Sequence, residues 1–216
     1  MKPRVVVIGA RPDGHARVVA DALRLAGRYE LAGFLDDNER LWKTRLEGAP
    51  VLGGLALLAQ LRKRQIRYAV IGVGENAARR RLAKRLDDAG VMPASAIHPR
   101  ACVARGAVVE AGAVILAGAV VNPGAVIGAH AVVNTAATVD HDCRVGAYAF
   151  LGPGAHLAGR VRIGDGAFLG TGAVAIPDAV VGAWAVVGAG SVVVDPVPAH
   201  ATVVGAPARP IRRGTR

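Results

Sequence analysis

From Ile97 to Val193 an aliphatic residue recurs at every sixth position of the chain. This step gives 17 positions, and all hold valine, isoleucine or leucine except Ala175. An amphipathic helix repeats about every 3.6 residues and a flat strand every two, so neither sustains a period of six. A parallel β-helix does, because each six-residue face turns one aliphatic side chain inward and stacks it on the coil below. The period therefore predicts a β-helix and C-terminal tail over residues 97–216.

Before residue 97 the sequence alternates β-branched runs with stretches of helical periodicity. Strands are expected at 4–8, 29–35 and 68–71, and helices at 14–26, 55–65 and 75–88. Strands that alternate with helices of about ten residues or more imply a parallel sheet with helical crossovers. Residues 1–96 are therefore predicted to form an α/β, Rossmann-like domain.

The chain is basic, with a formal net charge of +11 over 216 residues. The basic runs at 62–64 and 79–81, with Lys84 and Arg85, fall in expected helices and have no aromatic side chains interleaved for base stacking. They are interpreted as solvated helix faces rather than as a nucleic-acid site. Their positive potential would still attract an anionic small substrate.

Other sequence features limit the class of protein. No run of about 18 apolar residues is uninterrupted, and the N-terminus lacks the apolar stretch of a signal peptide. The two cysteines, Cys102 and Cys143, are too few for a disulfide framework. These features predict a soluble, cytoplasmic protein.

A polar cluster interrupts the otherwise apolar repeat. Asn134-Thr135 and Asp140-His141-Asp142-Cys143 stand where other coils hold alanine, glycine and valine. An imidazole between two carboxylates can accept a proton near neutral pH, and a carboxylate can fix its tautomer. A surface histidine on a loop is the alternative, but the clustering favours a functional role.

The same cluster is not predicted to bind metal. Adjacent residues on an extended chain point to opposite sides, and no second His/Cys cluster follows to complete a coordination shell. Cys143 shares its phase in the period of six with Ala137, Ala149 and Ala155, which suits a small packing residue. A covalent acetyl-cysteine is therefore a minor alternative.

Glycines follow the first expected strand. Gly9 and Gly14 would let the backbone approach a phosphate at the open strand ends. The pattern is not a strict GxGxxG, so NAD is not predicted.

The [Ile/Val/Leu]-Gly-x4 repeat resembles that of the hexapeptide-repeat acyltransferases. The resemblance implies a left-handed parallel β-helix with three faces, a homotrimer, and acetyl-CoA bound between neighbouring helices. The opening Val7-Ile8-Gly9-Ala10 and Gly14-His15-Ala16, the Phe34-Leu35-Asp36-Asp37 segment and the closing Val204-Gly205-Ala206-Pro207 narrow it further. Together they resemble, over essentially the whole chain, the bacterial sugar-nucleotide N-acetyltransferases of bacillosamine and perosamine biosynthesis and the related sialic acid O-acetyltransferases.

This resemblance implies roles for individual residues. His141 matches the general base, Asp142 or Asp140 the acidic neighbour that orients it, and Asn134 an active-site asparagine. Gly159 matches a glycine whose N–H meets the thioester carbonyl. The residues expected to contact the nucleotide-sugar are Gly9, Gly14, His15, Asp36, Asp37, Gly72 and Gly74. The residues expected near the adenine end of CoA are Gly205, Pro207 and Ala208.

Two departures from the family pattern stand out. The turn from Gly9 to His15 is about two residues longer than in the family, and Phe150 replaces a second histidine of bacillosamine-type relatives. The second change removes one candidate donor to the thioester.

The function implied is transfer of an acetyl group from acetyl-CoA to the 4-amino group of a nucleotide-linked 4-amino-4,6-dideoxy-sugar, best GDP-perosamine, in polysaccharide biosynthesis. A UDP-linked bacillosamine-type sugar and O-acetylation of sialic acid remain alternatives. A purely structural scaffold is a third, and the Asp-His-Asp cluster argues against it.

Overall fold

The computed structural model describes residues 2–211, and the chain divides into two compact units, Met1–Pro99 and Arg100–Arg216. The end of the expected tail, 212–216, lies outside the described residues. No helix among the described residues is long and apolar enough to cross a membrane.

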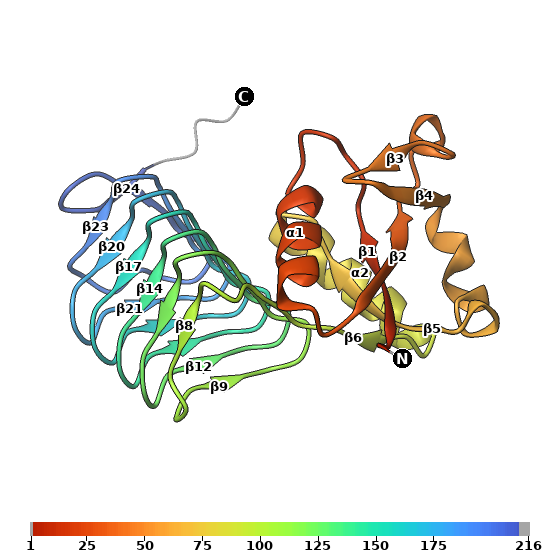
Figure 1. Cartoon of the computed structure of the whole chain (residues 1–216). Coiled ribbons are helices and arrows are strands. Elements are labelled where there is room, and N and C mark those ends of the chain that lie inside the picture. Colours follow the sequence, from red (N-terminus) through yellow and green to blue (C-terminus); the bar gives the residue numbers. More distant parts are fainter. Residues whose placement is uncertain (1, 212–216) are drawn as a thin grey trace. The chain divides into compact units, whose positions relative to one another are not determined.

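The first unit is built on a six-stranded sheet with the order β3-β4-β2-β1-β5-β6 (Figure 1). Its strands are β1 Arg4–Ile8, β2 Glu30–Leu35, β3 Arg45–Leu46, β4 Ala49–Gly53, β5 Ile66–Ile71 and β6 Met92–Pro93, followed by β7 Ala96–Ile97. Its helices are α1 Ala16–Ala26 and α2 Asn76–Asp88, with 3-10 turns at Glu39–Leu41, Leu55–Gln60 and Arg62–Arg64. Strand β1 pairs in parallel with both β2 and β5, which places their carboxyl ends along one edge of the sheet.

The expected α/β domain is confirmed, with three local corrections. The predicted helix 55–65 is instead two 3-10 turns, broken at Leu61 and ended by Gln65 in a left-handed conformation. The antiparallel pair β3 and β4 was not predicted, because each strand is short and β4 contains Pro50. Arg79, interpreted from sequence as part of a solvated helix face, is only 1% exposed.

The second unit is a parallel β-helix with three sheets (Figure 1). The first sheet contains β10 Val114–Ile115, β13 Val132–Val133, β16 Phe150–Leu151, β19 Phe168–Leu169, β22 Val186–Val187, β24 Thr202–Val204 and the antiparallel β25 Arg209–Pro210. The second contains β8 Cys102–Val103, β11 Val120–Val121, β14 Thr138–Val139, β17 His156–Leu157, β20 Val174–Ala175 and β23 Val192–Val193. The third contains β9 Val108–Val109, β12 Val126–Ile127, β15 Arg144–Val145, β18 Arg162–Ile163 and β21 Val180–Val181.

The predicted period of six is confirmed in the packing. Each strand from β8 to β23 ends on one of the predicted aliphatic positions, and these side chains are buried from Ile115 to Val193. Thr138 pairs with His156 and Val139 with Leu157, so residues 18 apart lie side by side on consecutive coils. Burial of an aliphatic column at each of the three faces provides the core of this unit.

From Gly112 to Gly190, the residue three positions after each inward aliphatic side chain adopts a left-handed backbone conformation and turns the corner of the β-helix. Glycine fills some of these corners, as at Gly124 with φ +76°, but Asp142 adopts φ +60° and Arg160 φ +61°. A non-glycine residue in this region is uncommon and is retained where the surrounding structure holds it. The backbone at these corners therefore fixes the direction in which a polar side chain leaves its Cα atom.

Candidate active site

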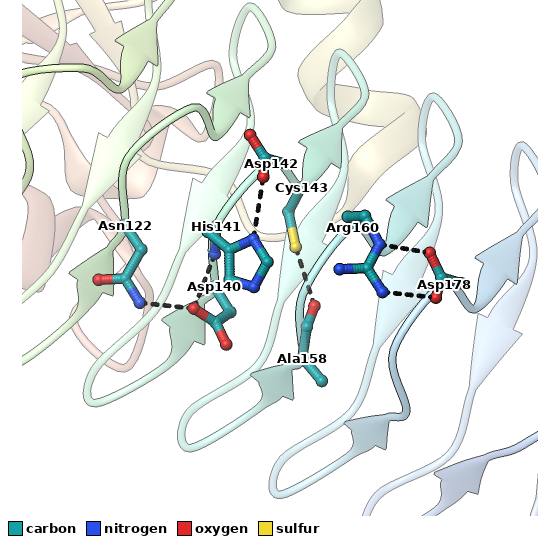
Figure 2. Close-up of polar contacts among 8 residues, drawn as sticks. All are labelled: Asn122, Asp140, His141, Asp142, Cys143, Ala158, Arg160 and Asp178. Carbon is teal, nitrogen blue, oxygen red and sulfur yellow. Dashed lines mark hydrogen bonds and ion pairs between the residues drawn. The ribbon is translucent and has the colours of Figure 1, made fainter.

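His141 lies at the corner between β14 and β15, and its imidazole is held by the next residue. Its Nδ1 lies 2.9 Å from Asp142 Oδ2 (Figure 2). A carboxylate only accepts, so Nδ1 carries a proton, and in the neutral imidazole Nε2 has the free lone pair. The side chain is 49% exposed, so a substrate can reach the imidazole.

The backbone of this corner is anchored to the coils on both sides. The N–H of Asp142 donates to the carbonyl of Pro123 at 3.1 Å, and the N–H of Arg160 donates to the carbonyl of His141 at 2.9 Å. The imidazole therefore projects from a backbone that cannot shift without breaking inter-coil bonds.

Asp140 has a different role from Asp142. Its Oδ1 accepts hydrogen bonds from the Asn122 side-chain amide at 2.8 Å and from the His141 backbone N–H at 2.7 Å (Figure 2). The hydrogen bond from the Asn122 amide, with a smaller contribution from the His141 N–H, holds the pKa of Asp140 below its ordinary value. Of the two predicted acidic neighbours, Asp142 contacts the imidazole, while Asp140 holds the backbone that carries it.

Gly159 occupies the position of His141 one coil further along, and it lies against the imidazole. A Cβ atom at Gly159 would be 2.6 Å from His141 Nε2. Gly124, one coil before Asp142, similarly leaves room for the Asp142 carboxylate. The His141 and Asp142 side chains thus rest on two glycines. A larger residue at either glycine would displace the side chain that rests on it.

Cys143 and Arg160 complete the corner shown in Figure 2. Cys143 is buried, its Sγ lies 3.1 Å from the carbonyl oxygen of Ala158, and burial raises the pKa of its thiol. Arg160 forms a two-pronged ion pair with Asp178 at 2.7 and 2.8 Å. A buried thiol of raised pKa is a poor nucleophile, so the geometry favours the histidine as the reactive group.

The structure does not bring Asn134 to His141 within one chain. Asn134 lies at the preceding corner, between β13 and β14, and its Oδ1 accepts the N–H of Thr135 at 2.8 Å. Phe150 lies on β16 and stacks on Phe168 with 5.3 Å between ring centroids. Within the described residues, Asn134 lies at another corner and Phe150 lies on another sheet of the β-helix than the strands that flank His141.

In the first unit, a cavity of about 340 Å³ opens at the carboxyl ends of β1, β2 and β5. Six of the seven residues expected to contact the nucleotide-sugar line it: Gly9, Gly14, His15, Asp36, Gly72 and Gly74. Gly72 is required there by packing, since a Cβ atom would lie 2.7 Å from Ala16 Cα at the start of α1. Ligands of open α/β sheets bind at this edge.

Two titratable side chains of the cavity, His15 and Asp36, are held by their surroundings. Burial, with a smaller contribution from the positive charge of Arg79, lowers the pKa of His15 to about 4. Its imidazole is therefore neutral at pH 7. Asp36 accepts the N–H of Ala10 at 2.8 Å and of Asn38 at 2.9 Å, which holds the loops after β1 and β2 together.

Asp37 is the predicted residue that does not line this cavity. Its carboxylate accepts the N–H of Leu55 at 2.7 Å and pairs with Arg85 at 3.3 Å. It lines a separate hollow of about 490 Å³ that includes Trp42 and Leu57.

The predicted CoA-end residues form the turn between β24 and β25. Gly205 has φ +97° and donates its N–H to Ser191 Oγ at 3.0 Å, and the Ala206–Pro207 peptide is cis. The N–H of Ala208 donates to the carbonyl of Val192 at 2.8 Å. This turn therefore extends the second sheet beyond β23.

Sequence reasoning missed two residues of these sites, Asn122 and Arg79. Asn122 carried a usable signal, because it stands 18 residues before Asp140 and so lies beside it on the previous coil. Arg79 gave none, since an arginine within an arginine run is normally solvated. Among residues 2–211 no group of histidine, cysteine and acidic side chains is arranged to hold a metal ion.

Two protein-family models match this chain. The PglD N-terminal domain matches residues 4–86, and the bacterial transferase hexapeptide (six repeats) matches residues 142–175 and 160–195. A comparison with curated protein sequences found no significant match.

Several solved structures match nearly the whole chain. Perosamine N-acetyltransferase from Caulobacter crescentus, with one histidine replaced by asparagine and in complex with CoA and GDP-perosamine, is 39% identical, with a TM-score of 0.90 and 96% of each chain covered. The acetyltransferase domain of PglB from Neisseria gonorrhoeae FA1090, in complex with acetyl coenzyme A, is 37% identical, with a TM-score of 0.89 over 98% of this chain and 100% of that one. WeeI from Acinetobacter baumannii AYE is 28% identical, with a TM-score of 0.84 over 96% and 99%.

These matches confirm the predicted fold class, an α/β domain followed by a left-handed parallel β-helix. The chain belongs to the family of hexapeptide-repeat acetyltransferases that includes perosamine N-acetyltransferase.

Proposed function

We propose that this chain transfers the acetyl group of acetyl-CoA to the 4-amino group of a nucleotide-linked 4-amino-4,6-dideoxy-sugar, with GDP-perosamine as the leading candidate. The observation that carries the proposal is the His141 corner, where Asp142 holds Nδ1 and Gly159 leaves Nε2 uncovered. The family relationship supports it, since the related perosamine N-acetyltransferase is in complex with CoA and GDP-perosamine.

In this mechanism the sugar amine attacks the thioester carbonyl directly. His141 Nε2 takes a proton from the amine as the new C–N bond forms, and Asp142 stabilises the resulting imidazolium. The C–S bond then breaks, and the imidazolium gives its proton to the leaving sulfur, so that CoA departs as the thiol and His141 returns to its neutral form. The N–H of Gly159 makes no hydrogen bond within residues 2–211 and is the candidate donor to the tetrahedral oxyanion.

Acetyl-CoA is a long ligand, and the second sheet provides the length. His141 follows β14, and the turn at Gly205 and Ala208 bonds to Val192 of β23, three strands further along that sheet. Three strand spacings of about 4.8 Å separate β14 from β23, about 14 Å in all, and the turn lies beyond β23. A thioester at His141 would therefore place the nucleotide end of an extended CoA near Gly205, Pro207 and Ala208.

We assign the nucleotide part of the acceptor to the cavity that contains Gly9, Gly14 and His15. The proposal includes a homotrimer with active sites at subunit interfaces, and a cytoplasmic reaction. Asn134 would belong to such a site only if another subunit brings it there, because within one chain it lies at a different corner.

Thiol release from acetyl-CoA tests the proposal. GDP-perosamine, a UDP-linked 4-amino-4,6-dideoxy-sugar and sialic acid are compared as acceptors, and we expect release with a nucleotide-linked amine. Release with sialic acid alone would replace N-acetylation with O-acetylation. His141→Asn should reduce kcat about 10²-fold or more while CoA binding is retained; unchanged turnover would exclude the general-base role.

A further inference from the structure

Arg79 is the largest buried charged side chain among residues 2–211, and it lies behind the cavity of the first unit. It is 1% exposed on α2, and burial lowers the pKa of its guanidinium to about 10, so it remains charged at pH 7. A buried cation is retained only where hydrogen bonds compensate for its lost hydration.

The guanidinium bonds to the loop between β5 and α2. Its Nη1 donates to the carbonyls of Val73 and Gly74, both at 3.1 Å, and its Nη2 donates to Asn76 Oδ1 at 2.9 Å. Val73, Gly74 and Glu75 all line the cavity. Arg79 therefore fixes the orientation of two consecutive peptide groups in the cavity wall.

The orientation of those peptides has a chemical consequence. In a trans peptide the carbonyl and the following N–H point in opposite directions. Because the carbonyls of Val73 and Gly74 converge on Arg79, the N–H groups of Gly74 and Glu75 face away from it. Within residues 2–211 neither N–H donates a hydrogen bond. Adjacent N–H groups turned to one side form a concave site for an anionic oxygen.

The acidic side chains of the cavity are already engaged. Asp13 pairs with Arg11 at 3.0 Å, and Asp36 accepts two backbone N–H groups. Glu75 accepts the N–H groups of Ala77 and Ala78 at 2.7 and 2.6 Å. Each carboxylate has its own donors, which leaves the Gly74 and Glu75 N–H groups for a ligand.

We propose that Arg79 is a positioning residue that turns the N–H groups of Gly74 and Glu75 toward the cavity, where they bind a phosphate oxygen of the nucleotide-sugar. The inference rests on the proposed function, because it assigns the diphosphate of that substrate to this wall.

The first test compares Arg79→Met with Arg80→Met, which removes an exposed arginine from the next position of the same helix. In Arg79→Met we expect the KM for the nucleotide-sugar to rise about tenfold or more, with little change in kcat or in the KM for acetyl-CoA. Calorimetry should show the same loss for GDP or UDP, whichever binds the wild type, and none for the nucleoside. Arg80→Met should behave as the wild type.

A second pair of variants tests one N–H directly and does not depend on Arg79→Met folding. Glu75 has φ −73°, which proline adopts without strain. Glu75→Ala removes the capping carboxylate but keeps the N–H, whereas Glu75→Pro removes both. We expect Glu75→Pro to bind the nucleoside diphosphate about tenfold more weakly than Glu75→Ala.

The outcomes separate the two proposals. Suppose that the wild type acetylates nucleotide-sugars. If Arg79→Met then leaves the KM for the nucleotide-sugar unchanged, or if Glu75→Pro and Glu75→Ala bind the nucleoside diphosphate equally well, only the role of Arg79 is overturned. Equal losses of affinity for nucleoside and nucleoside diphosphate also overturn it, since a general distortion of the cavity would explain them. A wild type that acetylates only sugars without a nucleotide overturns the proposed function and this site with it.

Discussion

His141 and Gly159 occupy equivalent positions on consecutive coils, and a Cβ atom on Gly159 would lie 2.6 Å from His141 Nε2. The atom that would be displaced is at the end of a side chain rather than in the backbone. The corner can therefore accept a larger residue by moving the imidazole, which separates an effect on catalysis from an effect on folding.

Gly159→Ala is accordingly expected to reduce kcat about a hundredfold, because the imidazole must leave its position against residue 159. The melting temperature should change by only a few degrees. Steady-state kinetics and thermal unfolding check both points. Gly106→Ala is the control, since a Cβ there finds no atom closer than 3.8 Å. Full activity in Gly159→Ala would show that the observed imidazole position is not the reactive one.

Loss of the Asn122 amide should weaken the support of the catalytic corner. In Asn122→Ala, Asp140 loses the hydrogen bond that contributes most to lowering its pKa, and the pKa of its carboxyl rises toward the ordinary value. We expect kcat to fall about three- to tenfold, with little change in the KM for acetyl-CoA.

Asp165→Ala is the matched control for that variant. It removes a comparable inter-coil bond, from Asp165 to the N–H of Ala147 at 2.9 Å, at another corner. If both variants lose the same activity, the effect is one of general stability and Asn122 has no special role.

Cys143 should be dispensable for catalysis. The thiol is buried and its pKa is raised, so Cys143→Ala is expected to keep kcat within about threefold. Mass spectrometry after brief alkylation of the native protein should find the label on exposed Cys102 and not on Cys143. An acetyl group trapped on Cys143 during turnover would contradict direct transfer.

The neutral state of His15 predicts how the first unit responds to acid. Its pKa is lowered to about 4 in the folded chain, against about 6.5 when unfolded, so below pH 6.5 the unfolded state binds a proton that the folded state does not. Stability should therefore be complete above pH 6.5 and fall by at most about 3 kcal/mol as the pH drops to 4. Urea unfolding between pH 7.5 and 4 measures this loss. His15→Gln should flatten the pH dependence in that window, and an unaltered slope would assign the proton to another group.

The β-helix could be predicted because its period is repeated over many coils, so that a single miss such as Ala175 did not obscure it. The same period explains why Asn134 and His141 lie at different corners of one chain. Residues seven apart in the sequence are separated by one six-residue face and one further position, so they lie at successive corners.

The details of the first unit were harder to predict from sequence, because the features that differ from the prediction depend on tertiary contacts. Arg79 is buried by the carbonyls of Val73 and Gly74, which lie near it only after β5 and α2 have packed. The 3-10 turns of 55–65 have the same apolar content as an α-helix and differ only in their hydrogen bonds.

The coil length of 18 residues determines how this enzyme can tolerate changes in its own length. Removal or insertion of a whole coil would keep each remaining side chain on its face and alter only the length of the β-helix. Removal of six residues between Gly124 and His141 would keep every aliphatic side chain inward but carry His141 and Gly159 together to a different corner, away from Asn122 and Gly124 on the preceding coil. An alignment of the aliphatic repeat therefore does not by itself align the catalytic residues. Relatives of different length must be aligned so that any insertion or deletion is a multiple of three repeats.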